Sequence, residues 1–209
     1  MNDYRNTKYC PCLDNLRSKK TTLESKIHTE HRKAIDLHAQ ISPNDSQYKT
    51  DFIQIYNGKC AYCGASIQFI PRNMFEIDHY IPVTSDRFSS KSSAGYMDNL
   101  VLSCHTCNHN KSGFEIPEQY LDQLHPDGPG ITSFFYRDDM FYILVADGQP
   151  AEITEFYNRL ILGRETSRID YLLMNMIGLY NHIEDKSEIH DLLGKAIELL
   201  REKRNLMAE

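Results

Sequence analysis

Two Cys-x-x-Cys pairs are the residues whose types and spacing point most directly to chemistry in this chain. They are Cys60-Ala-Tyr-Cys63 and Cys104-His-Thr-Cys107. Four thiolates in two such pairs can close a tetrahedral Zn²⁺ site. The two pairs are separated by 40 residues, which is too many for an ordinary zinc ribbon. We therefore expect the intervening segment to fold as a unit that the zinc fastens at both ends.

Polar residues inside and directly after this segment could do chemistry. His79 could act as a general base, because a neutral imidazole titrates near neutral pH and can accept a proton from water. Its neighbour Asp78 offers a hard carboxylate oxygen of the kind that Mg²⁺ or Mn²⁺ prefers. Asn108 directly follows the last cysteine and adds a carbonyl oxygen. The spacing predicts that zinc brings the three residues together in a catalytic site.

The order of these elements resembles an HNH nuclease domain of the zinc-stapled ββα-metal type, a His-Me finger endonuclease, from about Gly58 to Gly113. The elements that carry the resemblance are Cys60-x-x-Cys63, Asp78-His79, Asn99-Leu100-Val101 and Cys104-x-x-Cys107-Asn108-x-x-Lys111. The family often has His at the position of Asn108, a known variation that bears on metal affinity. The resemblance implies metal-dependent phosphodiester hydrolysis with His79 as the base and a catalytic metal on Asp78 and Asn108.

The resemblance also gives Asn99 a role, which is to hold the imidazole of His79 in its productive tautomer. The alternative is an asparagine that serves only the turn before Leu100. Glu76 alternates with Asp78 along a predicted strand, so the two side chains should share a face. Glu76 is therefore either an additional group at the metal or a partner in a structural salt bridge.

Other polar residues near the cysteines have less specific interpretations. Lys111 lies one helical turn after Asn108 and could contact phosphate or simply face solvent. His105 and His109 are expected at the surface, since four thiolates already satisfy the zinc, with His109 an additional candidate for the catalytic metal. Two further cysteines, Cys10 and Cys12, are interpreted as free thiols; a second metal site with His28 and His31 is the alternative.

Composition narrows the class of protein. The chain of 209 residues contains no run of about 18 apolar residues, so no membrane span is expected. Residues 1–12 lack the apolar stretch of a secretion signal, and six cysteines without such a signal favour metal thiolates in a reducing cytoplasm.

The net charge of −6 is unevenly distributed along the chain. Residues 1–50 hold 9 Lys or Arg against 6 Asp or Glu, residues 51–113 hold 5 of each, and residues 114–209 hold 9 against 18. The acidic C-terminal part would be repelled by DNA. We expect the substrate to meet the N-terminal and central parts, and the C-terminal part to pack internally or to bind a protein.

The predicted fold is α+β, with a zinc-stapled ββα unit between an N-terminal helix and a mainly helical C-terminal half. Three segments are expected: 1–47, a helical N-terminal segment; 48–113, the nuclease domain; and 114–209, a hairpin plus helices. Apolar residues at helical spacing predict one helix from Leu13 to Ile41. Its polar face carries six basic residues that either face solvent or track phosphates: Arg17, Lys19, Lys20, Lys26, Arg32 and Lys33.

Within the central segment, residues 48–57 are expected to form a short helix. Two strands, Ser66–Ile70 and Phe75–Val83, should pair through the turn at Pro71. A loop over Thr84–Met97 and a helix from near Cys104 to Lys111 would complete the unit. Beyond it we expect a hairpin within Ile131–Ala146 and three helices over 151–163, 166–183 and 186–204.

These features predict an endonuclease that hydrolyses DNA, most simply the double-stranded form. An RNA nuclease, for example on tRNA, and a non-catalytic zinc-dependent module that binds nucleic acid are the alternatives. The layout also resembles nuclease components of bacterial anti-phage defence systems of the Septu-type and retron-linked kinds, which pair with an ABC-type ATPase. Apolar stripes around Tyr171, Met174 and Tyr180 are the expected docking surface for such a partner.

Overall fold

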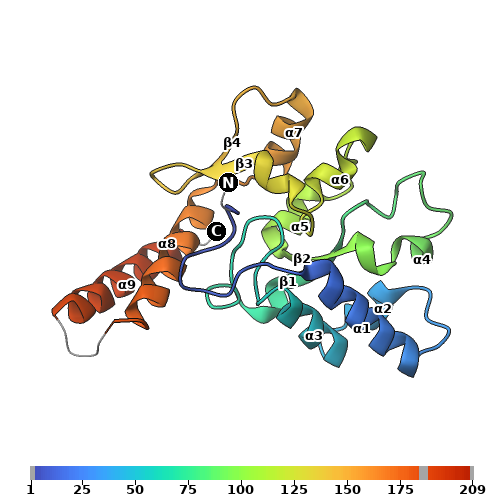
Figure 1. Cartoon of the computed structure of the whole chain (residues 1–209), viewed down its shortest axis with the longest axis horizontal. Coiled ribbons are helices and arrows are strands. Elements are labelled where there is room, and N and C mark those ends of the chain that lie inside the picture. The colour runs from blue at the N-terminus through green and yellow to red at the C-terminus, as the bar shows by residue number, and fades with distance from the viewer. Residues whose placement is uncertain (1–2, 184–187, 208–209) are drawn as a thin grey trace.

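A computed structural model describes residues 3–183 and 188–207 of the chain (Figure 1). Three N-terminal helices, α1 (Leu16–Glu30), α2 (Leu37–Ile41) and α3 (Gln47–Ile55), pack against one another beside a small sheet. The single helix predicted for Leu13–Ile41 is thus two helices. The chain leaves the helical conformation at His31, and α2 begins anew because the carboxylate of Asp36 accepts the backbone N–H of Ala39 (3.1 Å).

The central sheet is an antiparallel hairpin of β1 (Phe75–His79) and β2 (Leu100–Cys104), with Phe75 opposite Cys104 and His79 opposite Leu100. The prediction that Ser66–Ile70 is the partner of β1 was wrong. That segment forms turns, in which the N–H groups of Phe69 and Ile70 both bond to Ser66 O. The loop between the strands contains the short helix α4 (Lys91–Ala94) and the 3₁₀ turn η2 (Met97–Asn99).

Helix α5 (His105–Lys111) follows β2 directly and packs on both strands, as predicted for the ββα unit. A 3₁₀ turn, η1 (Arg72–Met74), precedes β1. After α5, three short elements connect the unit to the C-terminal part: η3 (Glu118–Tyr120), α6 (Leu121–Leu124) and η4 (Gly130–Ser133). The fold is therefore mixed helix and small sheets, as expected from the sequence.

The predicted C-terminal hairpin and helices are present. The hairpin is β3 (Phe135–Arg137) with β4 (Ile143–Val145), and the helices are α7 (Ala151–Arg159), α8 (Glu165–Tyr180) and α9 (Glu188–Leu206). Residues 186 and 187 of the third predicted helix lie outside the described residues. No helix in the described ranges is long and apolar enough to cross a membrane.

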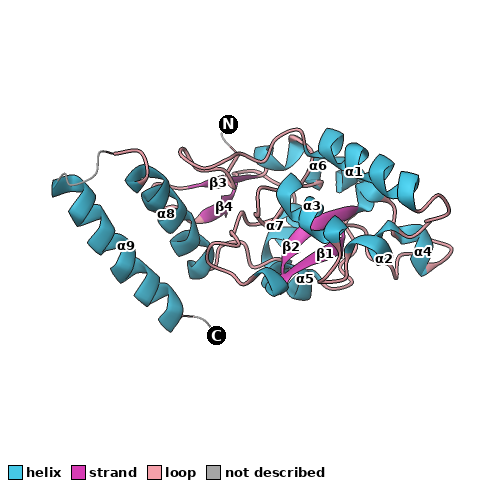
Figure 2. Ribbon diagram, turned by 90° about the horizontal axis from the view of Figure 1, so that it is seen from below, coloured by secondary structure: helices cyan, strands magenta, loops and turns pink. Residues whose placement is uncertain are grey.

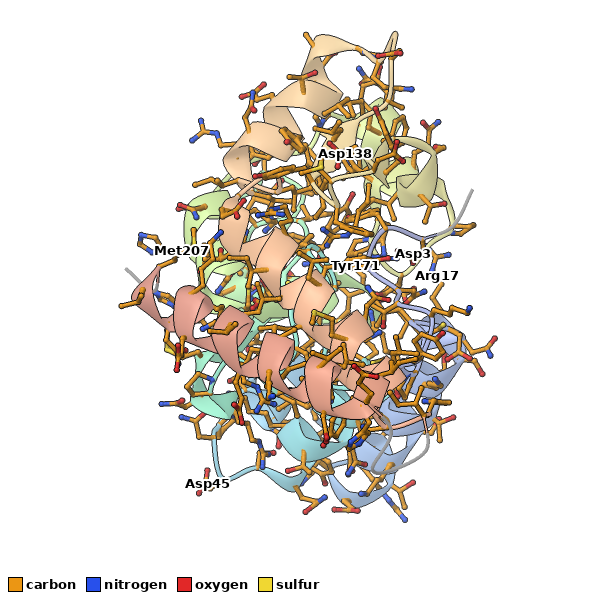
Figure 3. The ribbon with its side chains drawn as sticks, turned by 90° about the vertical axis from the view of Figure 1, so that its left-hand side faces the viewer. Asp3, Arg17, Asp45, Asp138, Tyr171 and Met207 are labelled. Atoms are coloured by element: carbon orange, nitrogen blue, oxygen red, sulfur yellow. The ribbon has the colours of Figure 1, made fainter. Side chains whose placement is uncertain are left out.

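One hydrophobic core contains buried side chains from Tyr4 to Leu162, so α7 and the second hairpin share it with the ββα unit. A smaller cluster joins α8 and α9 through Ile169, Leu173 and Ile197, and Phe69 of the central segment packs against it. In Figure 2 these two helices form one end of the molecule, and Figure 3 looks onto them. Helix α8 is attached to the body through further contacts with the N-terminal residues, the second hairpin and the cysteine cluster.

Residues of two surfaces predicted to bind partners instead make contacts within the chain: the basic face of the N-terminal helix and the apolar stripe of α8. Lys20 is fully buried in an ion pair with Asp127 (2.6 Å) and does not belong to a phosphate-facing surface. On α8, Met174 is 2% exposed, Tyr171 lies beneath the guanidinium of Arg137, and Tyr180 stacks on His190. Met174 is therefore buried, and Tyr171 and Tyr180 are half-buried by contacts within the chain. The predicted docking stripe around these three residues is not a fully exposed surface, and docking of a partner there stays a prediction.

Candidate active site

The four cysteines predicted to bind zinc meet in one buried cluster, with sulfur atoms all within 4.8 Å of one another. The sulfurs of Cys63 and Cys104 are 3.8 Å apart. A tetrahedral Zn²⁺ with Zn–S bonds of about 2.3 Å requires S···S edges of about 3.8 Å. The donor set and its spacing therefore fit a structural zinc ion, which would join the turn before β1 to the β2–α5 junction.

The turn between Cys60 and Gly64 is held by contacts with the N-terminal residues. Gly64 has a φ of +76°, and a Cβ there would come within 2.9 Å of the backbone of Arg5. The guanidinium of Arg5 in turn donates to Ala61 O (2.6 Å), and Tyr4 Oη donates to Tyr62 O (2.6 Å). The N-terminal residues thus hold the first cysteine pair from outside, and glycine is required where the two backbones touch.

Asp78 points to the α5 side of β1 and is 6% exposed. Its carboxylate accepts hydrogen bonds from Tyr62 Oη (2.6 Å) and from Lys111 Nζ (3.1 Å). Burial raises the pKa of Asp78, and the charge of Lys111 opposes that rise. Lys111 is itself 1% exposed and also donates to His79 O (2.7 Å). Neither suggestion for Lys111, phosphate contact or solvation, describes this buried position.

Asn108 and Glu76 lie on the same side as Asp78. The Asn108 amide donates to one carboxylate oxygen of Glu76, while His105 Nδ1 lies 2.7 Å from the other. His109 stacks on His105 with ring centroids 5.6 Å apart. This hydrogen bond orients the Asn108 amide and leaves its carbonyl oxygen without a hydrogen-bond partner among the described contacts. Carboxylate and amide oxygens are the ligand types that Mg²⁺ and Mn²⁺ prefer, although both oxygens of Asp78 are already engaged by Tyr62 and Lys111.

His79 points to the other side of β1, because successive side chains of a strand alternate. There its ring packs on that of His38 from α2, with centroids 4.3 Å apart and planes tilted by 31°. His38 Nε2 donates to Ile77 O (3.0 Å), since a carbonyl can only accept. Burial and the neighbouring His38 lower the pKa of His79 to about 4. The imidazole of His79 is therefore neutral at physiological pH.

Asn99 lies in η2 and is 1% exposed. Its side chain accepts from Ile81 N (2.7 Å) and donates to Ile81 O (3.0 Å) and Ala94 O (2.9 Å). Among the described contacts, all hydrogen bonds of this amide go to backbone atoms and none to the imidazole of His79. Asn99 thus fixes the chain two residues after His79, which differs from the predicted contact with the ring itself.

The alternative metal site near the N-terminus is not assembled. In the described part of the chain, the four central cysteines are the only group of three or more His, Cys, Asp or Glu side chains close enough to hold a metal. Cys10 bonds to Met174 O, while His28 pairs with Glu24. Cys10 and Cys12 have free thiols, as interpreted from the sequence.

Three residues at the site were not identified from the sequence. Tyr62 lies inside the first Cys-x-x-Cys pair and donates to Asp78, so its place within the motif could have marked it in the sequence. His38 and Arg164 are far from the motif along the chain, and nothing local marks them. Arg164 reaches the cysteine cluster from the start of α8, with Nη2 3.2 Å from Cys63 Sγ.

A ββα unit with a four-cysteine cluster and an Asp-His pair at the strand end defines the class of this domain. Residues 60–114 match the family model described as HNH endonuclease, so the chain contains an HNH endonuclease domain in that segment. The chain is similar to the CRISPR-associated endonuclease Cas9 of Corynebacterium diphtheriae, with 27% identity over 99 residues. That similarity covers 47% of this chain but only 8% of the Cas9 protein, and no solved structure matches.

Proposed function

We propose that this chain is a metal-dependent endonuclease that hydrolyses phosphodiester bonds of DNA, with His79 as the general base. The observation that carries the proposal is the division of groups at the end of β1. The His79 imidazole lies on one side of the strand, and the side-chain oxygens of Asp78 and Asn108, our proposed metal ligands, lie on the other.

In-line displacement at phosphorus needs the base and the metal to act on one phosphate from opposite directions. His79 and Asp78 are adjacent at the end of β1, so a phosphate bound across that strand end could meet both groups. His79 would accept the proton of the attacking water on its side of the strand. A bound Mg²⁺ or Mn²⁺ would supply electrostatic stabilisation of the phosphate and of the leaving 3′ oxygen. Asn99 and Lys111, which both bond to backbone next to His79, would hold the imidazole in position. The products would be 5′-phosphate and 3′-hydroxyl ends.

DNA is preferred as substrate because the domain belongs to the endonuclease family and its relative is a Cas9 protein. The decisive experiment is a cleavage assay on DNA and RNA of matched sequence, with Mg²⁺, with Mn²⁺ and with EDTA. The proposal expects metal-dependent cleavage of DNA. Cleavage of RNA alone would establish the first alternative, and binding without cleavage would establish the zinc-dependent binding module.

We further propose a role in bacterial anti-phage defence in the cytoplasm. The compact nuclease with a helical C-terminal part supports this role through its layout, and the matched relative is a CRISPR-associated protein. A phage-plating assay of the native operon, with and without His79→Ala, tests the role. Equal protection by both versions would rule it out.

We propose that a protein partner of the ABC-type ATPase class docks on α9. Four large apolar residues of α9 are exposed to solvent, namely Ile189 (67%), Leu192 (58%), Leu199 (67%) and Leu206 (88%). Their spacing of three and seven residues places them along one side of the helix, whereas Leu193, Ile197 and Leu200 pack on α8. The acidic charge of residues 114–209 would complement a basic rim on such a partner.

A further inference from the structure

Arg164 brings the start of α8 into direct contact with the cysteine cluster. Its Nη2 lies 3.2 Å from Cys63 Sγ, 3.6 Å from Cys104 Sγ and 3.7 Å from Cys107 Sγ, and its Nη1 lies 3.6 Å from Cys107 Sγ. One guanidinium therefore spans three of the four sulfurs. In the described part of the chain, no other cationic side chain hydrogen-bonds to them.

The same guanidinium also holds the turn that precedes α8. Arg164 Nη1 donates to Leu160 O (3.2 Å) and to Ile161 O (3.3 Å), at the C-terminal end of α7. Ile161 has a φ of +49°, in the left-handed region that a β-branched residue rarely occupies. A Cβ at Gly163 would collide with Tyr157 Oη, so the chain passes tightly against α7. The turn thus has an unfavourable backbone conformation at Ile161. Two of its carbonyl groups accept hydrogen bonds from Arg164, which also donates to the cysteine sulfurs.

The charges explain why an arginine belongs at this position. Zn²⁺ with four thiolates carries a net charge of −2, and such a centre inside a protein needs compensating positive charge and N–H donors. Arginine presents several N–H groups in a planar fork, so it can bond to several sulfurs and to backbone carbonyls at once. A lysine ammonium at the same place is a point charge and could not span that set.

We propose that Arg164 couples zinc binding to the docking of the α8–α9 helix pair: the thiolates hold Arg164, and Arg164 holds the turn from which the two helices start. The coupling is reciprocal, because a contact that stabilises the docked helices in the zinc-bound protein must equally stabilise zinc in the docked protein. Arg164 lies outside residues 60–114, so this link is specific to the C-terminal part of this chain and is independent of the proposed cleavage reaction.

Zinc release from the full-length protein tests the coupling. Zinc-loaded wild type and Arg164→Gln are mixed with excess chromophoric chelator, and the release rate is followed by absorbance. Loss of an outer hydrogen-bond donor typically weakens metal binding about 10–100-fold, so Arg164→Gln should release zinc faster by a factor in that range. In cobalt-substituted protein the thiolate-to-cobalt charge-transfer bands should also shift, because the N–H···S bonds to the ligands are gone.

Limited proteolysis measures the other side of the coupling. Cleavage within residues 160–164 should increase in Arg164→Gln at full zinc loading, and it should increase in wild type when zinc is removed. The matched control is Arg168→Gln, one helical turn further along α8. Arg168 donates to Glu165 (2.8 Å) and touches no sulfur among its described contacts, so this control should behave as wild type in all three measurements.

If Arg164→Gln does not fold, Arg164→Lys tests the coupling between zinc binding and helix docking. It keeps the positive charge but not the fork, and it should fall between wild type and Arg164→Gln in release rate and proteolysis. The proposal is overturned if the folded Arg164 variants release zinc as slowly as Arg168→Gln with unchanged cobalt spectra. It is also overturned if zinc removal leaves the turn at residues 160–164 as protected as before.

Discussion

Asn99 and Ile81 are joined by a pair of hydrogen bonds in which one side-chain amide satisfies both backbone groups of the other residue. Asn99 Oδ1 accepts from Ile81 N (2.7 Å), and Asn99 Nδ2 donates to Ile81 O (3.0 Å). The chain leaves β1 at His79, so this amide fixes the exit of the strand that carries the proposed base. Its third bond, to Ala94 O, ties in the end of α4.

The first prediction concerns this clamp. Asn99→Ala removes the partner of the buried Ala94 O and of the two part-buried backbone groups of Ile81, and each group left unsatisfied costs up to about 1–3 kcal/mol. We expect a loss of roughly 2–5 kcal/mol in the free energy of unfolding, measured by urea denaturation, together with a lower cleavage rate in the folded fraction. Asn110→Ala is the control, since Asn110 donates to Thr106 O within its own exposed helix end. Equal stability of the two variants would contradict the clamp.

The second prediction concerns the base. His79→Ala should reduce the cleavage rate by about 10²–10⁴-fold, the usual contribution of a general base. Zinc content, thermal stability and DNA binding should stay near wild type, because the ring of His79 is only half-buried. His28→Ala is the control, since His28 pairs loosely with Glu24 on the surface of α1 (3.9 Å). Cleavage by purified His79→Ala at the wild-type rate would remove His79 from its role.

The third prediction separates the two proposed metal ligands. Asn108→Ala should lose activity through weaker Mg²⁺ binding, with partial rescue by excess Mn²⁺ and little change in stability. Asp78→Ala should behave differently, because it also leaves the buried ammonium of Lys111 without its carboxylate. Breaking a buried ion pair in this way typically costs about 3–5 kcal/mol. Urea denaturation and metal titration of both variants check this, and equal stabilities would show that the pair is unimportant for folding.

The cysteine cluster and the helix that follows it could be predicted from the sequence, because metal ligands recur at characteristic spacings along a chain. The cysteine pairs place Cys104 beside Cys60, and helix α5 must then follow β2. The partner of β1 was missed because Ser66–Ile70 is nearer in sequence and rich in strand-forming residues. The actual pairing lies beside the cysteine cluster, next to which Ala61 N donates to Leu102 O (2.7 Å). A pairing between residues 21 to 29 positions apart has no local signature.

The side-chain partners of the site were equally invisible in the sequence. Lys111 was expected at a surface because lysines usually are, yet the carboxylate of Asp78 holds it in the interior. His38 and Arg164 reach the site from α2 and α8, which a motif confined to residues 60–114 does not include. Their positions depend on how separate helices pack, and spacing along the chain does not determine that.

The fourth prediction concerns pH and rests on His125, which is 8% exposed. Its Nε2 donates to Asp98 O (2.9 Å), and its Nδ1 accepts from Asp127 N (3.1 Å), so the neutral ring is fully satisfied. Burial lowers its pKa; the carboxylate of Asp127 opposes this shift, while the charges of Lys20 and Arg17 add to it. The unfolded chain, with a histidine pKa of about 6.5, then binds more protons than the folded chain just below that pH.

Stability must therefore fall as the pH drops below about 6.5, by up to about 1.4 kcal/mol per pH unit for this one group. His38 and His79, whose pKa values are also lowered, act in the same direction. Urea denaturation of wild type and His125→Gln between pH 7.5 and 5 measures the effect, since glutamine keeps a donor for Asp98 O. The free energy of unfolding should fall less steeply with decreasing pH in His125→Gln than in wild type. Identical pH dependences would show that His125 titrates normally in the folded protein.

The fifth prediction concerns the exposed stripe of α9. Leu192→Glu and Leu199→Glu together should prevent docking of a protein partner while leaving the isolated chain folded and active, because both residues are more than half exposed. The matched control is a change on the polar side of the helix, Glu198→Gln with Glu202→Gln. Copurification from the native host and protection against phage should be lost only in the leucine variants.

Cleavage by the purified chain separates this effect from damage to the nuclease domain. If the leucine variants cut DNA as well as wild type in the test tube but fail in cells, the stripe acts through a partner. The reason is physical: solvent-exposed leucines contribute little to the folding of the chain that bears them, whereas buried against a partner each contributes about 1.5–3 kcal/mol. If no protein copurifies with wild type and the leucine variants protect cells as well as it does, the stripe has no partner.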